Sequence, residues 1–459
     1  MSAVGNGEPV GPESEKKVDL CLKVRKVGTL EAAWRHVRSS GRASTNDDIR
    51  KETESFDENA ISSLRLMHEQ LRHGTFVFQR QKGVGKKRVG KKVRPIVISP
   101  IPNRIVQRAI LMVSETVPLI SDVLNIPTSF GGITGADAAI ALALQHSTKQ
   151  GAWYVRSDIP DFFTQIPKPA ILEFLLTATG EAKFVDLFDQ AMAVELENEA
   201  ILKKQDLYDY FPTGLIGVAQ GSALSPLIGN ILLRDFDKEL NGDGITCIRY
   251  IDDFLLIGSS KEKVVRAFNA ATRLLAQHNL EAYDPQQRSD KAHLGPCDAG
   301  FDFLGCSIKG FHIVPGKKAR TALLKKVAEA YDDGIKAVAK ALAGEDRGRP
   351  TQRLAQSHGR VDRIVKGWGE SFAFCNDRRP IMELDRQITE LMKGFDGRVR
   401  DMMRNHDDAA VRRAAGITLL TDIERKVLPS PEEARSRARK KKVLPQRQRR
   451  TSRSKKSGS

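Results

Sequence analysis

Residues 248–257 read Ile-Arg-Tyr-Ile-Asp-Asp-Phe-Leu-Leu-Ile, two runs of β-prone residues on either side of an acidic pair. This pattern predicts a strand–turn–strand hairpin with Asp252 and Asp253 at its tip. Adjacent carboxylates repel each other, which raises the pKa of one of them unless a cation compensates. Two acids between apolar strands therefore favour a bound divalent metal ion, because hard cations prefer oxygen ligands. Asp is also a common turn residue, so the pair alone is equally compatible with a solvated turn.

The size and composition of the chain indicate a soluble protein of two or three domains. It has 459 residues, and 40% of them are hydrophobic, which is enough to build sizeable cores. No run approaches the roughly 18 apolar residues of a membrane span, and residues 1–17 contain no apolar signal core, so we expect a cytoplasmic protein. The cysteines lack CxxC or Cys/His spacing, which argues against a zinc module or a disulfide framework and predicts buried thiols. They are Cys21, Cys247, Cys297, Cys306 and Cys375.

The net charge of +17 and the isoelectric point of about 9.6 predict a polyanionic partner, most often nucleic acid. Most of this charge lies near the C-terminus, where residues 435–456 contain twelve Lys and Arg and no acid. Such a run is expected to be disordered, as is the segment 1–18. It is suited to be a nucleic-acid-binding arm, including Arg437, Lys440 and Lys441, or to be a solubilising end.

A second basic stretch, residues 76–94, is punctuated by glycines and leads into the apolar strand 93–98. It predicts a flexible cationic hairpin. Lys and Arg side chains can neutralise a triphosphate while the glycines let the backbone approach it. The alternative is a solvated basic loop.

Residues 153–163, Trp-Tyr-Val-Arg-Ser-Asp-Ile-Pro-Asp-Phe-Phe, predict a short strand with an acid at its end, because Pro160 terminates the ladder pairing. Asp158 is the candidate for a third carboxylate. Two metal ions held roughly 3.5–4 Å apart need acids from more than one strand. Asp158 and Asp161 are each also compatible with a helix cap.

The remaining elements are predicted from hydrophobic periodicity and from the positions of Gly and Pro. Small residues from 217 on precede a helix running to about residue 240. They let a base pair or sugar approach closely, although an ordinary helix N-terminus explains the same composition. Residues 128–132 predict a turn, residues 301–308 a hairpin arm, and residues 321–427 an almost entirely helical domain. Other helices are expected at residues 30–37, 61–74, 102–111, 136–145, 170–187, 190–202 and 264–278.

In this order, the motifs resemble those of bacterial reverse transcriptases over about residues 28–400. Tyr250-Ile251-Asp252-Asp253 looks like the family's Tyr-x-Asp-Asp box. Asp158 with Phe162-Phe163 looks like its first catalytic motif. Residues 220–226, Gln-Gly-Ser-Ala-Leu-Ser-Pro, match the helix-opening motif that contacts template and nucleotide.

Further segments resemble the group II intron branch of this family. Residues 93–96 and 103–110 resemble its fingers motifs, and Gly367-Trp368 with Leu384-Asp385 is similar to its thumb helices. The resemblance implies an α/β (α+β) right-hand polymerase fold, with fingers and palm followed by an all-helical thumb. The expected boundaries are a disordered N-terminus at 1–18, fingers at 19–150, a palm with the catalytic hairpin at 151–312, the thumb at 313–428 and a disordered basic tail at 429–459.

The resemblance also implies roles for individual residues. Two Mg²⁺ ions, or Mn²⁺ in their place, are held at Asp158, Ile159, Asp252 and Asp253, of which the three Asp are catalytic. One ion lowers the pKa of the primer 3′-hydroxyl, and the other steadies the pyrophosphate leaving group. Lys291 resembles the lysine that protonates pyrophosphate. Nucleotide-binding residues are expected at Lys87, Arg94, Phe162, Phe163, Gln220, Gly221 and Lys291, and nucleic-acid-binding residues at Arg104, Arg108 and Tyr250.

Phe163 bears on the choice of sugar. It stands five residues after Asp158, where the family places a bulky side chain against the incoming sugar. An aromatic ring at this place collides with a 2′-hydroxyl, which favours deoxynucleotides and therefore DNA synthesis.

The sequence departs from a full intron-encoded protein. Asn103 stands where the intron branch often has Asp, and residues 129–132 differ from the usual Phe-Arg-Pro-Gly. Only the basic tail follows the thumb-like helices, without the Cys/His-rich endonuclease that many such proteins carry. These features look more like the stand-alone bacterial reverse transcriptases of the unknown groups, several of which serve antiphage defence.

We therefore expect an RNA-directed DNA polymerase whose partners are an RNA template in the form of a dedicated noncoding RNA, dNTPs and the DNA product, with no membrane partner. One alternative is a group II intron-type maturase, an RNA-binding splicing cofactor in which the polymerase site is vestigial. Another is template-independent or protein-primed DNA synthesis at the same site. No pattern in the sequence predicts an oligomeric state.

Overall fold

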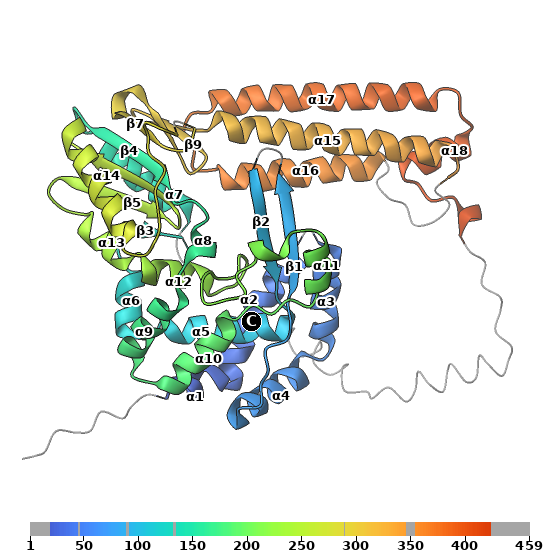
Figure 1. Ribbon diagram of the computed structural model, residues 1–459. Helices are drawn as coiled ribbons and strands as arrows, with labels where there is room; N and C mark the ends of the chain where they lie inside the picture. Colours follow the sequence, from blue (N-terminus) through green and yellow to red (C-terminus); the bar gives the residue numbers. More distant parts are fainter. Residues whose placement is uncertain are drawn as a thin grey trace, which may run out of the picture. The chain divides into compact units, whose positions relative to one another are not determined.

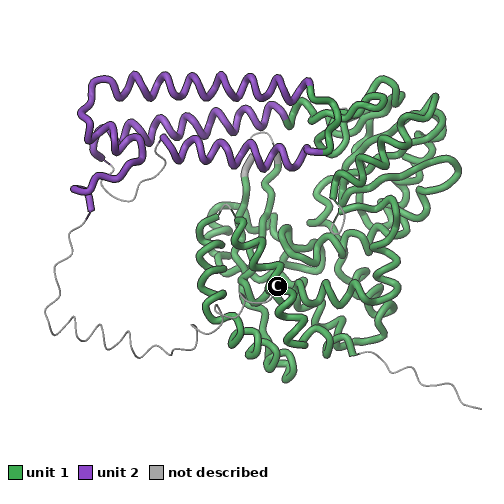
Figure 2. Tube along the Cα trace, turned by 180° about the vertical axis from the view of Figure 1, so that it is seen from behind, with its two compact units in different colours: residues 1–319, 374–378 green, residues 320–373, 379–459 purple. Residues whose placement is uncertain are grey.

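The computed structural model describes residues 19–44, 46–88, 91–131, 135–288, 290–345 and 354–423 (Figure 1). The chain forms two compact units, which Figure 2 colours separately. The first comprises the residues up to 319 together with 374–378, and the second comprises 320–373 and the residues from 379 on. The finer division of the first unit into fingers and palm stays a prediction. Within the described ranges, no helix is both long enough and apolar enough to cross a membrane.

A five-stranded sheet forms the centre of the first unit. Its order is β3-β5-β6-β4-β7, with β3 parallel to β5 and the other neighbours antiparallel. The predicted acidic hairpin is β5 with β6, and β4 is the predicted strand that ends in Asp158. The strands are β3 (Ser129–Phe130), β4 (Trp153–Asp158), β5 (Ile245–Tyr250), β6 (Asp253–Gly258) and β7 (His293–Pro296).

Both faces of this sheet are covered. Phe254, Leu255 and Leu256 follow one another in β6 and are all fully buried. Because successive side chains point to opposite faces, a continuous buried run requires cover on both sides. The helices α7 (Ala136–Ser147) and α14 (Lys261–Ala276) contact the strands and contribute to this cover.

One hydrophobic core extends from the N-terminal helices to the sheet. The helix predicted at 30–37 is part of α2, in which Leu30, Ala33, Trp34 and Val37 are all buried. The helix α2 packs against α5, which in turn contacts α10. Besides α14, the helices that contribute residues to this core are α1 (Leu20–Arg25), α2 (Val27–Arg42), α3 (Asp47–Glu58), α4 (Ala60–His73), α5 (Ile101–Ser114), α6 (Pro118–Leu124), α8 (Phe162–Gln165), α9 (Lys168–Thr179), α10 (Ala182–Met192), α12 (Ser225–Leu232) and α13 (Arg234–Glu239).

The predicted basic hairpin is confirmed as the antiparallel pair β1 (Lys82–Arg88) and β2 (Lys91–Ile98). Its base is fixed by Asn198, whose side chain accepts from the Gly83 N–H at 2.9 Å and donates to the Gly83 carbonyl at 2.8 Å. A small separate core beside it includes residues from β2, the helix α11 (Glu199–Lys204) and the segment around η1 (Tyr208–Tyr210).

The first unit also contains a three-stranded antiparallel sheet, with the strand order β10-β9-β8. Residues 374–378 return to this sheet. The Asn376 amide accepts from the Ile313 N–H at 2.8 Å and donates to the Phe311 carbonyl at 2.7 Å. The strands are β8 (Phe301–Phe303), β9 (Cys306–Lys309) and β10 (His312–Pro315), preceded by η2 (Cys297–Ala299).

The second unit is helical, as predicted. Its core includes Val327, Phe395 and Ala414 from three of its helices. The His358 Nε2 lies 3.0 Å from the Asp396 Oδ1, and this contact joins the two helices that carry these residues. The elements are α15 (Lys317–Leu342), which begins in the first unit, α16 (Leu354–Ser371), α17 (Arg379–Met403), α18 (Asp408–Ala415) and η3 (Leu420–Asp422).

The structure corrects several predicted elements. Ser129 and Phe130 form a strand instead of a turn, because their backbone pairs with β5. The helix expected at 170–187 is divided at Gly180, whose φ of 64° ends α9. The helix expected at 190–202 is absent there as a single element, since α10 ends at Met192 and α11 begins at Glu199. The helix expected to reach residue 240 is divided at Leu233.

The thiol prediction is confirmed in large part. All five cysteines are free, and Cys247, Cys297 and Cys306 are buried, whereas Cys21 and Cys375 are partly exposed. In the helix predicted at 61–74, Leu64 and Met67 are buried, whereas Ile61 is 69% exposed.

Candidate active site

The tip of the acidic hairpin consists of Ile251 and Asp252. Tyr250 pairs with Asp253 across the hairpin, so Asp253 is the first residue of β6. Ile251 has a φ of 59°, a left-handed conformation that is strained for a β-branched residue. Strain of this kind persists only where surrounding contacts impose it, and it is frequent at functional sites.

The strand β4 brings the third predicted carboxylate to this hairpin. Asp158 is the last residue of β4 and pairs directly with Asp253 in the register of β4 and β6. Directly paired residues have their Cβ atoms roughly 4.5–5.5 Å apart. The Ile159 N–H also donates to the Asp252 carbonyl at 3.0 Å. The structure thus brings Asp158, Ile159, Asp252 and Asp253 together at one end of the sheet.

Burial and mutual repulsion raise the pKa of two of these acids. The pKa of Asp253 rises to about 7, first because of burial and then because of the charges of Asp252 and Asp158. The pKa of Asp252 is also raised, by burial and then by Asp158. Lys291 opposes these effects in part, and its Nζ donates to the Asp158 Oδ2 at 3.1 Å. The site therefore carries a negative charge that a cation would relieve.

The donor chemistry of the site fits a hard divalent cation, because all three side chains offer carboxylate oxygens. In the part of the chain that the structure describes, no group of three or more His, Cys, Asp or Glu side chains is already arranged to hold a metal ion. The Asp158 carboxylate forms an ion pair with Lys291. Binding of a cation at Asp158 requires this ion pair to open, or requires the other oxygen of the carboxylate.

A pocket of about 490 Å³ lies next to the hairpin tip. It is lined by Ile251 and by four of the predicted nucleotide-binding residues. These are Arg94, Phe163, Gln220 and Gly221. The predicted nucleic-acid-binding residues Arg104 and Arg108 also line it, together with His36 of α2. A larger pocket of about 820 Å³, between α1, α4 and α10, contains none of the predicted site residues.

The loop that carries Gln220 is fastened to β2. The Arg94 Nε donates to the Gln220 Oε1 at 2.8 Å, and the Val97 N–H donates to the Gln220 carbonyl at 3.1 Å. Gly221 has a φ of 116°, and a Cβ there would lie 3.1 Å from the Val97 carbonyl oxygen. Glycine is therefore required for this close approach, which places Arg94 and Gln220 together in the pocket.

The two adjacent phenylalanines have different places. Phe163 is partly buried and lines the pocket, as predicted. Phe162 is only 2% exposed and belongs to the core, where a Cβ on Gly229 of α12 would lie 2.9 Å from its ring. The ring of Phe162 is thus part of the core, and the role of this residue in nucleotide binding stays a prediction. Asp161 does not cap α8 with its side chain, which instead accepts from the Lys92 Nζ at 2.6 Å.

The other predicted site residues are more scattered. Lys291 contacts Asp158 and does not line the pocket. Tyr250 is partly buried at the end of β5. Burial lowers the pKa of Arg104. The Lys87 side chain and the tail residues Arg437, Lys440 and Lys441 lie outside the part of the chain that the structure describes.

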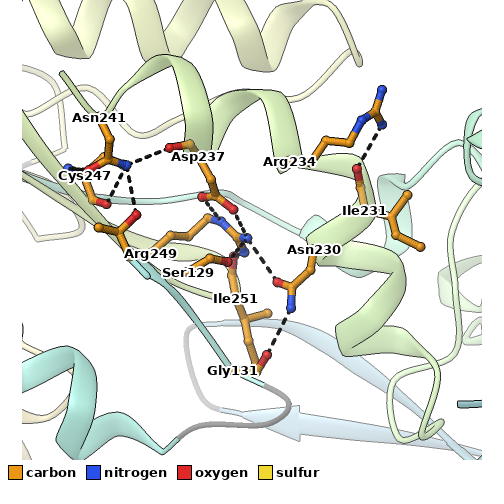
Figure 3. A network of polar contacts seen from close by, with 11 residues as sticks. Ser129, Gly131, Asn230, Ile231, Arg234, Asp237, Asn241, Cys247, Arg249 and Ile251 are labelled. Carbon is orange, nitrogen blue, oxygen red and sulfur yellow. Dashed lines mark hydrogen bonds and ion pairs between the residues drawn. The ribbon is translucent and has the colours of Figure 1, made fainter. Parts of the chain in front are cut away.

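Sequence reasoning missed a buried polar network beneath the hairpin tip (Figure 3). Arg249 of β5 is fully buried and forms an ion pair with Asp237 of α13. The signal for it was present, because an arginine inside a strand that is otherwise apolar requires a buried partner. The sequence alone does not say which acid supplies this partner.

Residues 84–306 match the model of the family described as "Reverse transcriptase (RNA-dependent DNA polymerase)". This range includes the pocket residues Arg94, Phe163 and Gln220 as well as all three acids. This stretch, just under half of the chain, is therefore similar to the reverse transcriptases, the RNA-dependent DNA polymerases. The α+β architecture of the first unit, followed by a helical part, agrees with the palm-and-fingers polymerase fold of that family.

Two curated proteins are similar to parts of this chain. Protein YkfC of Escherichia coli (strain K12) is 23% identical over 317 residues, which cover 58% of this chain and 80% of YkfC. The group II intron-encoded protein LtrA of Lactococcus lactis subsp. cremoris is 27% identical over 212 residues, covering 45% of this chain and 32% of LtrA. The match thus spans about a third of the length of LtrA. Among solved structures, a partial Cas6-RT-Cas1–Cas2 complex is 21% identical and covers 55% of this chain and 40% of that chain, with a TM-score of 0.33.

Proposed function

We propose that the chain adds deoxynucleotides to a primer on an RNA template by two-metal-ion nucleotidyl transfer. The observation that carries this proposal is the register of β4 and β6, which sets Asp158 directly opposite Asp253 and beside Asp252. A pair of divalent ions needs carboxylate ligands from more than one strand, and these three acids come from β4 and from the hairpin of β5 and β6 and meet at one end of the sheet. The family match supports RNA as the template and DNA as the product.

Asp158, Asp252 and Asp253 would hold Mg²⁺, which would supply charge neutralisation of the triphosphate and activation of the primer hydroxyl. The residues of the chain orient the reactants. Arg94 offers a cation in the pocket, held in place by its hydrogen bond to Gln220. In this proposal the guanidinium binds the phosphates of the incoming nucleotide.

Lys291 and Phe163 complete the proposed site. The Lys291 ammonium lies 3.1 Å from Asp158 and holds a proton that can be given to the leaving group. The Phe163 ring lines the pocket beside Ile251, where it would exclude the 2′-hydroxyl of a ribonucleotide. The substrates of this proposal are therefore dNTPs.

Primer extension tests the proposal. Purified protein is incubated with a primer annealed to RNA, dNTPs and Mg²⁺, alongside the variants Asp252→Ala and Asp253→Ala. Each variant should lose about a thousandfold or more of the incorporation rate, since several kcal/mol of charge stabilisation depend on these ligands. Asp298→Ala, an exposed acid of the same unit, is the matched control. No incorporation by the unchanged protein, or equal rates for all variants, contradicts the proposal.

We further propose that the chain works in the cytoplasm as a stand-alone enzyme of antiviral defence, copying a dedicated noncoding RNA. The support is its departure from the intron branch at Asn103. The buried Asn103 side chain donates to the Gln79 carbonyl at 2.8 Å and accepts from the Gln79 N–H at 3.0 Å, which an ionised Asp cannot do. Sequencing the RNA and DNA that copurify with the protein tests this role, and the absence of one enriched RNA would contradict it.

The similarity to LtrA favours a second candidate function, that of a maturase-like RNA-binding splicing cofactor. Here the polymerase site is not needed, so Asp253→Ala should leave binding and splicing of the cognate intron unchanged. A third candidate is template-independent or protein-primed synthesis at the same site. Sequencing the DNA product and testing whether the DNA is lost with protease treatment distinguish it from templated extension.

A further inference from the structure

A single buried guanidinium connects the acidic hairpin to three neighbouring elements (Figure 3). The Arg249 Nε donates to the Asp237 Oδ1 at 2.7 Å, and its Nη2 contacts the other oxygen of that carboxylate. The Nη2 also donates to the Ser129 Oγ at 2.6 Å and to the Asn230 Oδ1 at 3.0 Å. The Nη1 donates to the Ile251 carbonyl at 2.9 Å. Strand β3 and helices α12 and α13 thus all reach the hairpin through Arg249.

Stability alone is a weak explanation for this ion pair. Arg249 is 0% exposed and Asp237 is 1% exposed, so both charges have lost their water. The desolvation penalty of such a pair often exceeds the attraction between the charges, and apolar residues of similar volume can be equally stable. A better explanation for a buried ion pair is that it holds the neighbouring backbone and side chains in one specific conformation. The geometry that Arg249 specifies is found at its own hairpin tip.

The strained residue Ile251 is held at both of its backbone groups. Its carbonyl accepts from Arg249, and its N–H donates to the Phe130 carbonyl at 3.2 Å. Beside it, a Cβ on Gly131 would lie 2.4 Å from the Ile251 Cγ1, so glycine is needed there. The Asn230 amide donates to the Gly131 carbonyl at 3.4 Å, which joins this neighbour to the same network. Ile251 cannot leave its left-handed conformation without breaking the bond to Arg249.

Ile251 immediately precedes the two hairpin acids, and its side chain lines the pocket. We propose that Arg249, oriented by Asp237, is a positioning residue of the polymerase site. It keeps Ile251 in the left-handed conformation and thereby fixes Asp252 and Asp253 relative to Asp158 and to the pocket. This inference rests on the proposed polymerase function, and its structural part can be tested without catalysis.

The experiment must distinguish a network that only stabilises the fold from one that positions the hairpin tip. A residue of the same unit provides a matched control for this purpose. Asn241 is half-buried and bonds to the same network through Asp237 (Figure 3). Its side chain donates to the Thr128 Oγ1 at 2.9 Å, to the Asp237 carbonyl at 2.7 Å and to the Cys247 carbonyl at 3.3 Å, and accepts from the Cys247 N–H at 2.9 Å. None of these bonds reaches Ile251. Asn241→Ala therefore removes a comparable set of bonds while leaving the hairpin tip held.

The experiment compares full-length Arg249→Lys and Asn241→Ala with the unchanged protein. Lysine keeps the charge but cannot form the forked contacts of a guanidinium. The first readout is hydrogen exchange by mass spectrometry of peptides covering 248–256, without metal or substrate. Exchange there should be faster in Arg249→Lys and unchanged in Asn241→Ala, even if both variants melt at a lower temperature.

The second readout is steady-state primer extension. Arg249→Lys should lower kcat by about tenfold or more, since a displacement of about 1 Å at a reacting centre can cost up to about a hundredfold. The Mg²⁺ concentration for half-maximal rate should rise about threefold or more, with the Kd for primer–template unchanged. Asn241→Ala should keep kcat and the Mg²⁺ dependence of the unchanged protein.

The inference is overturned if Arg249→Lys keeps the normal exchange, kcat and Mg²⁺ dependence, or if Asn241→Ala loses activity to the same degree. If Arg249→Lys does not fold, Ser129→Ala and Asn230→Ala each remove one bond of the guanidinium. Faster exchange of the tip in both variants then supports the positioning role, and normal exchange overturns it. Absence of primer extension by the unchanged protein contradicts the proposed function, while the exchange measurement still decides whether Arg249 fixes the tip.

Discussion

Asp253 gives the metal-free protein a measurable dependence of stability on pH. Burial and the charges of Asp252 and Asp158 raise its pKa from 3.8 to about 7. A carboxyl group whose pKa is raised by folding binds its proton more tightly in the folded state. The folded state therefore loses stability as the pH rises from 3.8, the unfolded value, to about 7, the folded value, and the loss is complete above that pH.

The substitution Asp253→Asn removes this charge and keeps the size of the side chain. A shift of this size corresponds to about 4 kcal/mol, at about 1.36 kcal/mol per pH unit. Because Asp252 titrates together with Asp253, we expect roughly half of that value, about 2 kcal/mol, for the single substitution. At pH 8 in EDTA the variant should thus melt about 3 °C above the unchanged protein, and the difference should shrink toward pH 5.

Thermal unfolding followed by circular dichroism measures this difference. The scans are made in EDTA at pH 5 and pH 8, with Asp298→Asn as an exposed control whose Tm should follow that of the unchanged protein. Added Mg²⁺ should stabilise the unchanged protein at pH 8 more than Asp253→Asn. If the variant melts at or below the unchanged protein at pH 8, or if the gap does not vary with pH, the reasoning about burial and repulsion is refuted.

Further predictions concern the pocket and the tail. Phe163→Val should lower the preference for dNTPs over rNTPs in kcat/KM by about tenfold or more, and an unchanged ratio in single-nucleotide incorporation would exclude this ring as the barrier. Arg94→Ala should raise the KM for dNTPs by about tenfold, whereas Lys82→Ala, exposed on the neighbouring strand, should leave it within about twofold. Deletion of the residues after 434 should weaken nucleic-acid binding and flatten the dependence of log Kd on log salt. An unchanged slope would make the tail a solubility segment.

The parts of the fold with strong local signals could be predicted from the sequence. The acidic hairpin follows from its β-prone runs, and the structure places it at 245–258. The helix α2 follows from its apolar spacing, and α4 from Gly74, whose φ of 67° ends the helix. The division of the longer helices was harder to predict. Gly180 ends α9 through its positive φ, but Leu233 carries no local signal for the break between α12 and α13.

The contacts of the site depend on partners far apart in the chain, and these could not be read from local pattern. Asp158 meets Lys291 across 133 residues. Phe162 and Phe163 are chemically identical, yet successive residues of a helix point about 100° apart, so one ring enters the core and the other reaches the pocket. The order of motifs identified the acids correctly as neighbours in space. It carried no information on how Arg249 holds them.

Residues 374–378 belong to the first unit, although they connect two long helices of the second. Asn376 supplies hydrogen bonds to Phe311 and Ile313 at the edge of the small sheet. During synthesis, this edge therefore stays incomplete until the ribosome has released the residues of α15 and α16 as well. A chain cut after residue 319 lacks that closing segment, so the first unit is not a module that can be excised by a single cut.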